Sequence, residues 1–408
     1  MALAREFEVV GFDTDASRID ELSNGIDRNA MYSTSDLMTS SLRFTGESDA
    51  LGQANFIIVA VPTPVDGANH PELTALREAC RTVGSRLRRG GVVVIESTVY
   101  PGCTEEVCVP ILERESGLVV NRDFGVGYSP ERIDPGDPRR TLGSVVKVVA
   151  AGDEETCEAL VEVYGRIVAA GLHVAPDIRT AEAAKLIENV QRDLNIALMN
   201  ELSILFHKLG LDTQEVFAAA TTKWNFLPFY PGLVGGHCIP VDPYYLVHKA
   251  DSIGHKSEVI LAGRHINDTM ASYVATEAVK LLSATGKEPA QCRALVLGLT
   301  FKEDVRDSRN AQSVRLVHEL ERMDIDVWVS DPLTRVEELA DRTIDDPFAG
   351  GEPFDLVVLA VPHKGYKDVD YEAYLRLFGD EPGGVLVDVR GMLTAKWFED
   401  NGVTYWRL

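Results

Sequence analysis

One cysteine stands in a setting suited to covalent chemistry. Cys238 follows Gly235, Gly236 and His237, and Asp242 lies four residues after it, between two prolines. The glycines remove side-chain bulk beside the thiol, and the prolines restrict the backbone on its other side. A thiolate is a strong nucleophile near neutral pH and adds to carbonyl carbons, so the segment indicates a catalytic nucleophile. The same pattern also fits a buried cysteine in a Gly/Pro turn.

A cation and an amide share one face of a long predicted helix. Residues 178–209 carry apolar side chains at helical spacing with no glycine or proline. Lys185 and Asn189 lie four residues apart within this segment, among apolar neighbours. Such a pair could hold a developing oxyanion, although a solvated helical stripe would show the same spacing. Helices of this length commonly link domains or form subunit contacts.

Strand-like and helix-like segments alternate over the first 150 residues. The strand-like segments are 6–12, 56–61, 92–96, 124–128 and 145–150. Helical patterns lie between several of them, at 17–22, 72–88 and 104–113. This alternation predicts a parallel sheet with helices on both faces.

Polar residues follow the ends of these predicted strands. Asp13 comes after 6–12, where an acid of a nucleotide-binding fold bonds the ribose hydroxyls of NAD and disfavours the extra phosphate of NADP. Thr63 and Thr98 follow the next two strands, at the edge where such sheets bind ligands. Glu131 lies in a Ser-Pro-Glu-Arg turn. Each residue also has an ordinary interpretation: a helix N-cap for Asp13, turn residues for the threonines and surface charge for Glu131.

The alternation returns after Gly286 as an internal repeat. Residues 325–332 parallel 7–13, residues 354–362 parallel 54–62, and residues 383–388 parallel 90–96. The two copies are separated by helical patterns at 178–209, 212–222 and 256–284. We therefore predict an α/β protein with two Rossmann-like parallel-sheet domains joined by a central helical region with one long helix. The predicted boundaries are 1–175, 176–285 and 286–408.

The two copies differ at their beginnings. In the second copy, a strand, a loop and a helix at 293–323 precede Asp331, whereas only twelve residues precede Asp13. We therefore expect the chain to lack the first strand and glycine-rich phosphate loop of its first copy. Because that loop normally holds the pyrophosphate, we expect weak NAD binding and an exposed sheet position.

A charged loop follows the first strand of the second copy. The segment 302–309 reads Lys-Glu-Asp-Val-Arg-Asp-Ser-Arg. At this position Lys302 and Arg309 could bind a pyrophosphate through their side chains. A solvated run of surface charge is the alternative.

Composition limits the partners and the location of the protein. The 408 residues are 45% hydrophobic and 25% charged, as in ordinary globular proteins, with a net charge of -23. This charge disfavours nucleic acid, and local Arg and Lys must attract any anionic substrate. The apolar runs are only strand-sized, no secretion signal opens the chain, and the six cysteines and nine histidines show no metal-binding spacing. We therefore expect a cytoplasmic protein without disulfides, metal or membrane span.

Taken in order, the motifs resemble the UDP-glucose/GDP-mannose dehydrogenase family over essentially the whole chain. They are Asp13, Val-Pro-Thr-Pro (61–64), Glu-Ser-Thr-Val-Tyr-Pro-Gly (96–102), Ser-Pro-Glu-Arg (129–132), Ala-Lys-Leu-Ile-Glu-Asn (184–189), Gly-Gly-His-Cys-Ile-Pro-Val-Asp-Pro-Tyr-Tyr (235–245) and Gly-Leu-Thr-Phe-Lys (298–302). His237 and Val241 resemble the branch that acts on UDP-N-acetylhexosamines, because the UDP-glucose and GDP-mannose branches typically carry lysine where Val241 stands. Within that branch the chain looks most similar to enzymes for UDP-N-acetylmannosamine, with those for UDP-N-acetylglucosamine close behind.

The resemblance implies a four-electron oxidation of the sugar C6 alcohol to a carboxylate by two NAD in turn, for polysaccharide biosynthesis. It implies that Cys238 forms a thiohemiacetal and a thioester, that Lys185 and Asn189 stabilise the oxyanion, and that Asp242 acts on water. The implied catalytic residues further include Glu131 and Thr98. The implied cofactor site comprises Asp13, Arg18, Pro62, Thr63 and Thr98. The implied substrate site comprises Glu131, Lys185, Asn189, Arg264, His237, Lys302 and Arg309, with Arg264 reaching across the boundary of a homodimer.

Two kinds of alternative remain open from the sequence. One is the same chemistry on UDP-N-acetylglucosamine, UDP-glucose or GDP-mannose. The other is a catalytically impaired protein that binds a nucleotide sugar, which the expected loss of the phosphate loop would explain.

Overall fold

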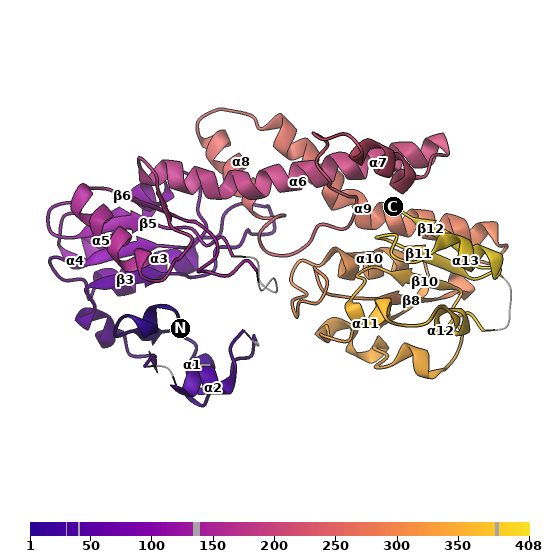
Figure 1. The fold of residues 1–408 in the computed structure, drawn as a ribbon, viewed down its shortest axis with the longest axis horizontal. Coiled ribbons are helices and arrows are strands. Elements are labelled where there is room, and N and C mark those ends of the chain that lie inside the picture. The colour runs from indigo at the N-terminus through magenta and orange to yellow at the C-terminus, as the bar shows by residue number, and fades with distance from the viewer. Residues whose placement is uncertain (30, 40, 134–138, 380–382) are drawn as a thin grey trace. The chain divides into compact units, whose positions relative to one another are not determined.

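The chain forms two compact units. A computed structural model describes residues 1–29, 31–39, 41–133, 139–379 and 383–408. The first unit comprises Met1–Glu188 and Tyr244–Lys256, and the second comprises Asn189–Pro243 and Ser257–Leu408 (Figure 1). The residues of the predicted central region are thus shared between the two units.

A five-stranded sheet forms the centre of the first unit. Its strands, in spatial order, are β3 (Phe56–Val59), β4 (Val92–Ile95), β5 (Gly125–Tyr128), β6 (Lys147–Ala151) and β7 (Leu172–Val174). Neighbouring strands are parallel, as predicted, except that β5 and β6 are antiparallel. The described residues between β5 and β6 contain no helix, and an antiparallel pair needs no helical crossover.

The first unit also contains helices. They are α1 (Ala16–Ser23), α2 (Thr34–Thr39), α3 (Thr74–Gly84), α4 (Val109–Ser116) and α5 (Glu154–Gly165), with short turns η1 (Leu3–Arg5), η2 (Ser48–Gln53) and η3 (Thr104–Cys108). Leu160 and Tyr164 of α5 pack on Val94 and Val149 of the sheet, and all four side chains are buried. Their burial gives the unit an apolar core of its own.

The strand that ends before Asp13 lies in a separate small sheet. β1 (Val10–Phe12) pairs in parallel with β2 (Arg43–Thr45), and this two-stranded sheet is not hydrogen-bonded to the five-stranded one.

The second unit is built on a fully parallel five-stranded sheet. Its spatial order is β12 (Thr404–Arg407), β11 (Val385–Asp388), β10 (Leu356–Leu359), β8 (Arg293–Leu297) and β9 (Asp326–Ser330). After β8, the chain adds β9 on one side of that strand and β10 on the other, so the strand order reverses between β8 and β10. Folds of this kind bind ligands at such a reversal, outside the carboxyl ends of the strands.

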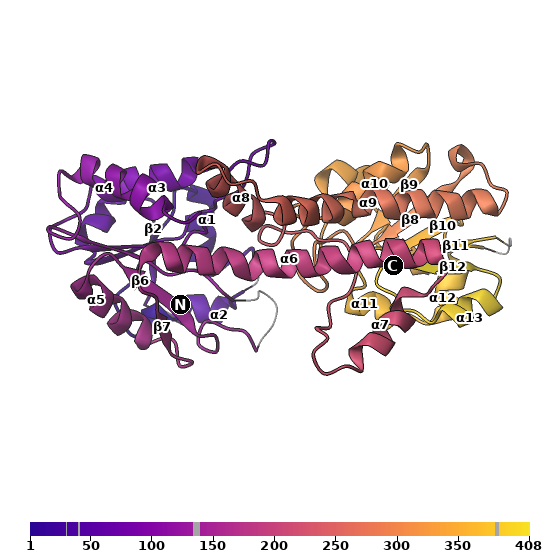
Figure 2. The same cartoon turned by 90° about the horizontal axis from the view of Figure 1, so that it is seen from above.

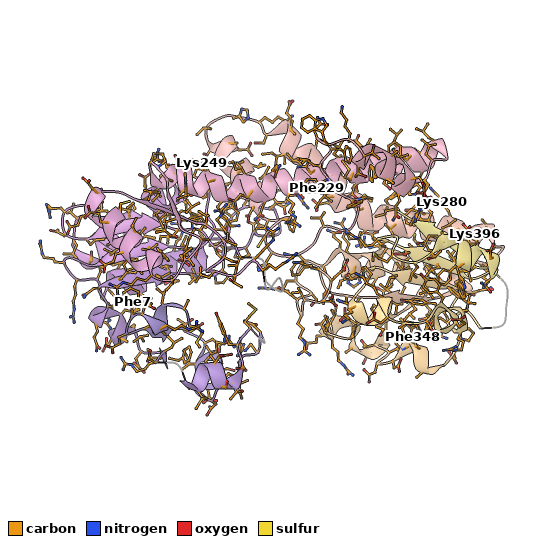
Figure 3. The ribbon with its side chains drawn as sticks, in the orientation of Figure 1. Phe7, Phe229, Lys249, Lys280, Phe348 and Lys396 are labelled. Atoms are coloured by element: carbon orange, nitrogen blue, oxygen red, sulfur yellow. The ribbon has the colours of Figure 1, made fainter. Side chains whose placement is uncertain are left out.

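Alternating side chains of this sheet build two apolar layers. Ala294 and Val296 face a cluster that includes α9 (Glu258–Ala284) and α10 (Gln312–Glu321). Leu295 and Leu297 face an aromatic cluster, against which Phe348 packs (Figure 3). The ring of Phe348 meets that of Tyr374 edge to face, with 5.1 Å between the ring centroids. The remaining elements of the unit are α7 (Thr213–Thr221), α11 (Lys364–Lys367), α12 (Tyr371–Arg376), α13 (Ala395–Asp400), η4 (Pro289–Gln291), η5 (Glu337–Arg342) and η6 (Pro347–Ala349).

Two helices contain residues of both units. α6 (Ile178–Leu209) is one unbroken helix with the bounds that the sequence predicted (Figure 2). α8 (Asp242–Ser252) begins directly after the cysteine segment. No helix in the described parts of the chain is both long and apolar enough to cross a membrane.

A buried carboxylate ties the start of α6 to the loop after β4. Glu182 is fully buried, and its oxygens accept hydrogen bonds from the backbone N–H groups of Gly102 (2.5 Å) and Thr104 (2.9 Å). Burial raises the pKa of Glu182 to about 7, although these hydrogen bonds oppose the rise. The folded state therefore holds this proton more tightly than the unfolded chain does.

We expect Glu182 to make stability depend on pH. Its contribution is fully present below the unfolded pKa of 4.5 and is lost as the pH rises to about 7, a change of at most about 3 kcal/mol. Glu182→Gln should remove this fall, which chemical denaturation at a series of pH values would measure. Glu155→Gln, at an exposed position on α5, is the control and should keep the wild-type slope. An unchanged slope in Glu182→Gln would contradict the assignment.

Candidate active site

The cysteine segment forms a tight turn that displays its thiol. The carbonyl oxygen of Cys238 accepts hydrogen bonds from the N–H groups of Val241 (3.1 Å) and Asp242 (2.9 Å), and α8 begins at Asp242. Cys238 and His237 are exposed. The alternative of a buried thiol is therefore wrong, and the turn presents the sulfur to solvent.

The two glycines are needed because the turn lies against another loop of the same unit. A Cβ on Gly235 would lie 2.8 Å from the carbonyl oxygen of Asn310, and one on Gly236 would lie 2.8 Å from the ring of Phe301. Gly236 also has a φ of +92°, which side-chain-bearing residues rarely adopt. The Asn310 amide donates to the Gly236 carbonyl at 3.2 Å. The thiol is thus positioned by the loop at 301–310.

An amide and a carboxylate meet beside the turn. The Nδ2 of Asn189 in α6 donates to Oδ2 of Asp242 at 2.5 Å, and Asp242 is only 2% exposed. Lys185, one helical turn earlier and in the first unit, is 8% exposed. The alternative of a solvated stripe at Lys185 is therefore wrong. The structure thus brings together the predicted residues Asn189 and Asp242.

A cation lies within electrostatic reach of the thiol. Arg309 donates to the carboxylate of Asp307 through Nε at 3.0 Å and Nη2 at 2.6 Å. The hydrogen bonds and charge of the Asp307 carboxylate raise the pKa of Arg309 above its usual value, although burial opposes the rise. The charge of the Cys238 thiolate raises the pKa of Arg309 further. Because a nearby cation favours a thiolate, Arg309 suits a nucleophile as well as a phosphate. The predicted residue His237 stands beside the same loop, its ring 6.1 Å from that of Phe301.

Arg264 is engaged within the chain. Its side chain is 1% exposed, donates to Oδ1 of Asp193 at 2.5 Å and pairs with Asp268. This buried ion pair joins α9 to α6. The prediction that Arg264 binds substrate across a subunit boundary stays a prediction.

A second buried amide holds the backbone that leads to the cysteine turn. Asn200 of α6 accepts from the N–H of Gly232 at 2.8 Å and donates to its carbonyl at 3.1 Å. Asn200 also donates to Asn267 of α9 at 2.8 Å. Sequence reasoning missed Asn200, and its only signal was an amide within an apolar helical pattern.

In the first unit, Asp13 carries an exposed carboxylate after β1. The N-cap of α1 is Asp15, which accepts from the N–H groups of Ser17 (2.9 Å) and Arg18 (3.2 Å). The alternative that Asp13 caps this helix is therefore wrong. Asp13 accepts one backbone hydrogen bond, from Asp15, and its exposed position suits a ribose hydroxyl. Arg18, also predicted for the cofactor, donates to Asp27 at 2.7 Å.

The loops after β3 and β4 are joined through two side chains. Ser97 donates to the carbonyl of Val61 at 2.7 Å and accepts from its N–H at 3.0 Å. Thr63 donates to the carbonyl of Thr98 at 2.7 Å. Pro62 is exposed between them. Three predicted cofactor residues thus meet at the carboxyl ends of neighbouring strands, where a nucleotide is expected.

The loop after β3 is also held by the carboxyl end of the cysteine motif. Tyr245 donates to the carbonyl of Thr63 at 2.8 Å, within the first unit. Tyr245 and Ser97 both lie in motifs of the family resemblance, but no local pattern singles them out.

A buried lysine contacts the backbone of the Ser-Pro-Glu-Arg turn. Lys147 of β6 donates to the carbonyl of Pro130 at 3.3 Å and lies 3.1 Å from the carboxylate of Glu96. Glu131 itself is exposed and accepts from the N–H of Ile133 at 2.6 Å. Sequence reasoning missed Lys147, because a lysine at the start of a strand shows no pattern that marks it as buried.

Comparison with known sequences assigns the chain to a family. Sequence profiles of the UDP-glucose/GDP-mannose dehydrogenase family match residues 1–168 (NAD binding domain), 179–269 (central domain) and 295–395 (UDP binding domain). The chain belongs to this family. It is an NAD-dependent nucleotide-sugar dehydrogenase, and the predicted family, cofactor and fold class are confirmed. Among the described residues, no group of His, Cys, Asp and Glu side chains forms a metal site.

Three relatives illustrate the similarity. Protein CapL of Staphylococcus aureus is 47% identical over 97% of this chain and 93% of its own length. A UDP-N-acetyl-D-glucosamine 6-dehydrogenase of Salmonella typhi is 46% identical over 97% of this chain and 94% of its own. The solved structure of a UDP-D-ManNAc dehydrogenase from Pyrococcus horikoshii superimposes with a TM-score of 0.88 at 29% identity, covering 96% of this chain and 92% of that one.

The predicted loss of an amino-terminal strand and glycine-rich loop is not borne out. The NAD-binding profile matches from residue 1 to residue 168, and the relatives are covered over more than nine-tenths of their length. The prediction assumes that the strands of the two copies of the repeat are arranged in the same way. The copies differ in layout, because β1 pairs with β2 in a small sheet of its own, whereas β9 joins the main sheet beside β8.

We expect Gly236→Ala to displace the thiol. The methyl group would strain a φ of +92° and contact the Phe301 ring, so the turn must shift. Because a small misplacement of a nucleophile is costly, kcat for NADH formation should fall at least about tenfold. Gly210→Ala is the matched control in the same unit, since Gly210 has a φ of +71° and nothing within 4 Å of the added methyl. Equal kcat values for a folded Gly236→Ala variant and the control would contradict this account.

Proposed function

We propose that the enzyme oxidises the C6 alcohol of a UDP-N-acetylhexosamine to the uronate through a covalent bond to Cys238. The observation that carries the proposal is the exposed Cys238 turn, with the hydrogen-bonded pair Asn189 and Asp242 at its end. UDP-N-acetyl-D-glucosamine is the preferred substrate in this proposal. Its support is the 46% identity to a relative named for that activity.

The substrate choice differs from the one that the motifs favoured. His237 and Val241 favour the branch that acts on UDP-N-acetylhexosamines, and within that branch the resemblance of the whole chain places UDP-N-acetylmannosamine first. The similarity to the UDP-D-ManNAc dehydrogenase of Pyrococcus horikoshii, at 29% identity, supports that sugar as the second candidate. N-acetylglucosamine and N-acetylmannosamine are epimers at C2 and share the reacting C6 group. The nucleophile and its neighbours can therefore act on either sugar.

The proposed chemistry proceeds in two oxidations and one hydrolysis. The first unit would hold NAD through Asp13, Pro62, Thr63 and Thr98, and the cofactor would supply a hydride acceptor for each oxidation of C6, with one proton released to solvent each time. The first converts the alcohol to an aldehyde, and the thiolate of Cys238 adds to the aldehyde carbon to give a thiohemiacetal. The second converts this adduct to a thioester. Water then attacks the thioester carbon, and the thiolate of Cys238 leaves as the carboxylate forms.

The predicted catalytic residues have distinct roles in this proposal. Adding the thiolate to a carbonyl puts negative charge on the oxygen, which Asn189 and Lys185 stabilise as hydrogen-bond donors. Asp242 accepts a hydrogen bond from the Asn189 amide, which fixes the orientation of that amide. The same carboxylate directs water to the thioester. Thr98 and Glu131 take part in the proton and water network, and Arg309 favours the thiolate and binds phosphate.

The first prediction of this proposal concerns stoichiometry and the nucleophile. The enzyme should form two NADH per sugar with UDP-N-acetyl-D-glucosamine, and less rapidly with UDP-N-acetylmannosamine, UDP-glucose and GDP-mannose. Cys238→Ala should lower uronate formation on the order of 10³-fold or more. Cys157→Ala, at a partly exposed cysteine of α5, is the control and should keep wild-type activity. Product analysis with absorbance of NADH measures both.

Two outcomes would contradict the proposed function. Uronate formation by Cys238→Ala at the wild-type rate would exclude the covalent route. Binding of these nucleotide sugars by the wild-type enzyme without any NADH would instead support a protein that only binds them.

We also propose a homodimer formed through α6. Leu198, Leu205 and Leu209 of this helix are 49%, 46% and 61% exposed. Their spacing of seven and four residues puts them on one helical face, and such an apolar stripe commonly contacts another helix. A cytoplasmic location also belongs to this proposal, because no disulfide joins the six cysteines, all of which the structure describes.

Replacing two leucines of this stripe should yield a monomer. In Leu198→Glu/Leu205→Glu, two charges would have to be buried in the interface, so association should weaken strongly. Light scattering coupled to gel filtration measures the mass. Met392→Glu, at an exposed apolar position of the same unit, is the control and should remain dimeric. A dimer of unchanged mass in the double variant would place the interface elsewhere.

A further inference from the structure

The second copy of the repeat uses its strand-end acid differently from the first. Asp13 is exposed after β1, whereas Asp331, at the same place after β9, has no exposed side-chain surface. Asp331 accepts hydrogen bonds from the N–H groups of Leu299 (2.6 Å) and Leu333 (2.8 Å) and lies 3.1 Å from Nε2 of His363. Burial alone would raise the pKa of Asp331, but these hydrogen bonds hold it below its usual value. Asp331 is therefore a buried carboxylate anchor and does not face a ribose.

The hydrogen-bond partners of His363 define which of its ring nitrogens carries the proton. His363 is 1% exposed, and its Nδ1 accepts from the backbone N–H of Asp304 at 2.9 Å. An amide can only donate, so the proton of the neutral ring is on Nε2, which lies 3.1 Å from Asp331 and 3.2 Å from the hydroxyl of Thr300. That hydroxyl in turn donates to the carbonyl of Lys302 at 2.8 Å. One imidazole thus fixes the backbone on both sides of Lys302.

Further contacts hold the same loop in an unusual shape. Asp304 has a φ of +57°, which few residues other than glycine adopt. Its carboxylate accepts from the N–H of Lys364 at the start of α11, at 2.9 Å. Lys367 of α11 pairs with Glu303 at 2.6 Å. The bent conformation is therefore imposed by the segment that follows β10.

This loop lies where the sheet should bind its ligand. The segment at 300–304 follows β8 and His363 follows β10, and these neighbouring strands flank the reversal of strand order. Ligands of such sheets bind outside the carboxyl ends at that point. Lys302 is the cationic side chain that the bent loop carries there. A diphosphate is the chemical group that such a cation would bind.

We propose that His363, anchored by Asp331, is a positioning residue that shapes the 300–304 loop so that Lys302 meets the diphosphate of the nucleotide sugar. The inference rests on the proposed function, since it assigns the nucleotide to this unit. His363 itself is too buried to touch the ligand and acts through the loop. Asp331 acts through His363.

Two variants of His363 separate positioning from general packing. His363→Asn keeps an acceptor near the position of Nδ1, so the Asp304 N–H remains satisfied. His363→Leu has a similar volume and no acceptor. Calorimetric titration of UDP into the whole enzyme should give a Kd within about threefold of wild type for His363→Asn and at least about tenfold weaker for His363→Leu. The Kd of NAD, measured in parallel, should not change.

A double-variant cycle tests whether the effect passes through Lys302. Lys302→Ala should weaken UDP binding by itself, and adding His363→Leu should weaken it little further, because the positioned side chain is already gone. If His363→Leu does not fold, Thr300→Val replaces it, since this change removes the hydroxyl that connects Nε2 of His363 to the Lys302 carbonyl.

Several results would overturn the inference. They are wild-type UDP affinity in His363→Leu, equal losses in the Asn and Leu variants, or fully additive losses in the cycle. Failure of the proposed function looks different: the wild-type enzyme would then form no NADH from any UDP sugar, whatever UDP affinities the His363 variants show.

Discussion

The reactive thiol depends on a close contact between two loops that only glycine permits. Gly235 and Gly236 lie so near Asn310 and Phe301 that a methyl group on either would sit 2.8 Å from its neighbour. The turn that displays Cys238 is therefore shaped by a loop more than sixty residues away in the sequence. Because the same loop carries Lys302 and Arg309, the nucleophile and the cations predicted to bind the nucleotide sugar are fixed within one unit.

Local charges offset the strongly acidic character of the whole protein. The net charge of -23 repels an anionic substrate at long range. At the site, Arg309 lies within electrostatic reach of Cys238, and the loop that holds both this residue and Lys302 is braced by ion pairs. Buried ion pairs such as Arg264 with Asp193 stabilise the supporting helices without adding charge at the surface. At the site, the Asp307 carboxylate fixes the Arg309 side chain, and the Thr300 hydroxyl fixes the backbone carbonyl of Lys302.

Divergence of the two repeat copies explains why one chain holds two different nucleotides. In the first unit, Asp15 caps the helix, which leaves the Asp13 carboxylate exposed for a ribose. In the second unit, the carboxylate of Asp331 already accepts hydrogen bonds from backbone amides and His363. It therefore offers no acceptor to a ligand. In the proposed function, the loop that carries Lys302 and Arg309 binds the ligand instead. The same strand-end position therefore serves recognition in one copy and architecture in the other.

Local patterns in the sequence determined the fold class, the bounds of α6, the repeat and the Gly/Pro turn around Cys238. These features are readable because periodicity and glycine or proline spacing act over a few neighbouring residues. The tertiary structure alone decided that Asp15 rather than Asp13 caps α1, that β5 and β6 are antiparallel, and that Arg264 is buried. It also revealed Asn200, Lys147 and His363 as supports of the site. Their partners lie from 17 to 67 residues away, so no local pattern records them. Burial and long-range hydrogen bonds arise only when distant segments pack together, and that packing assigns each polar side chain to a ligand or to the scaffold.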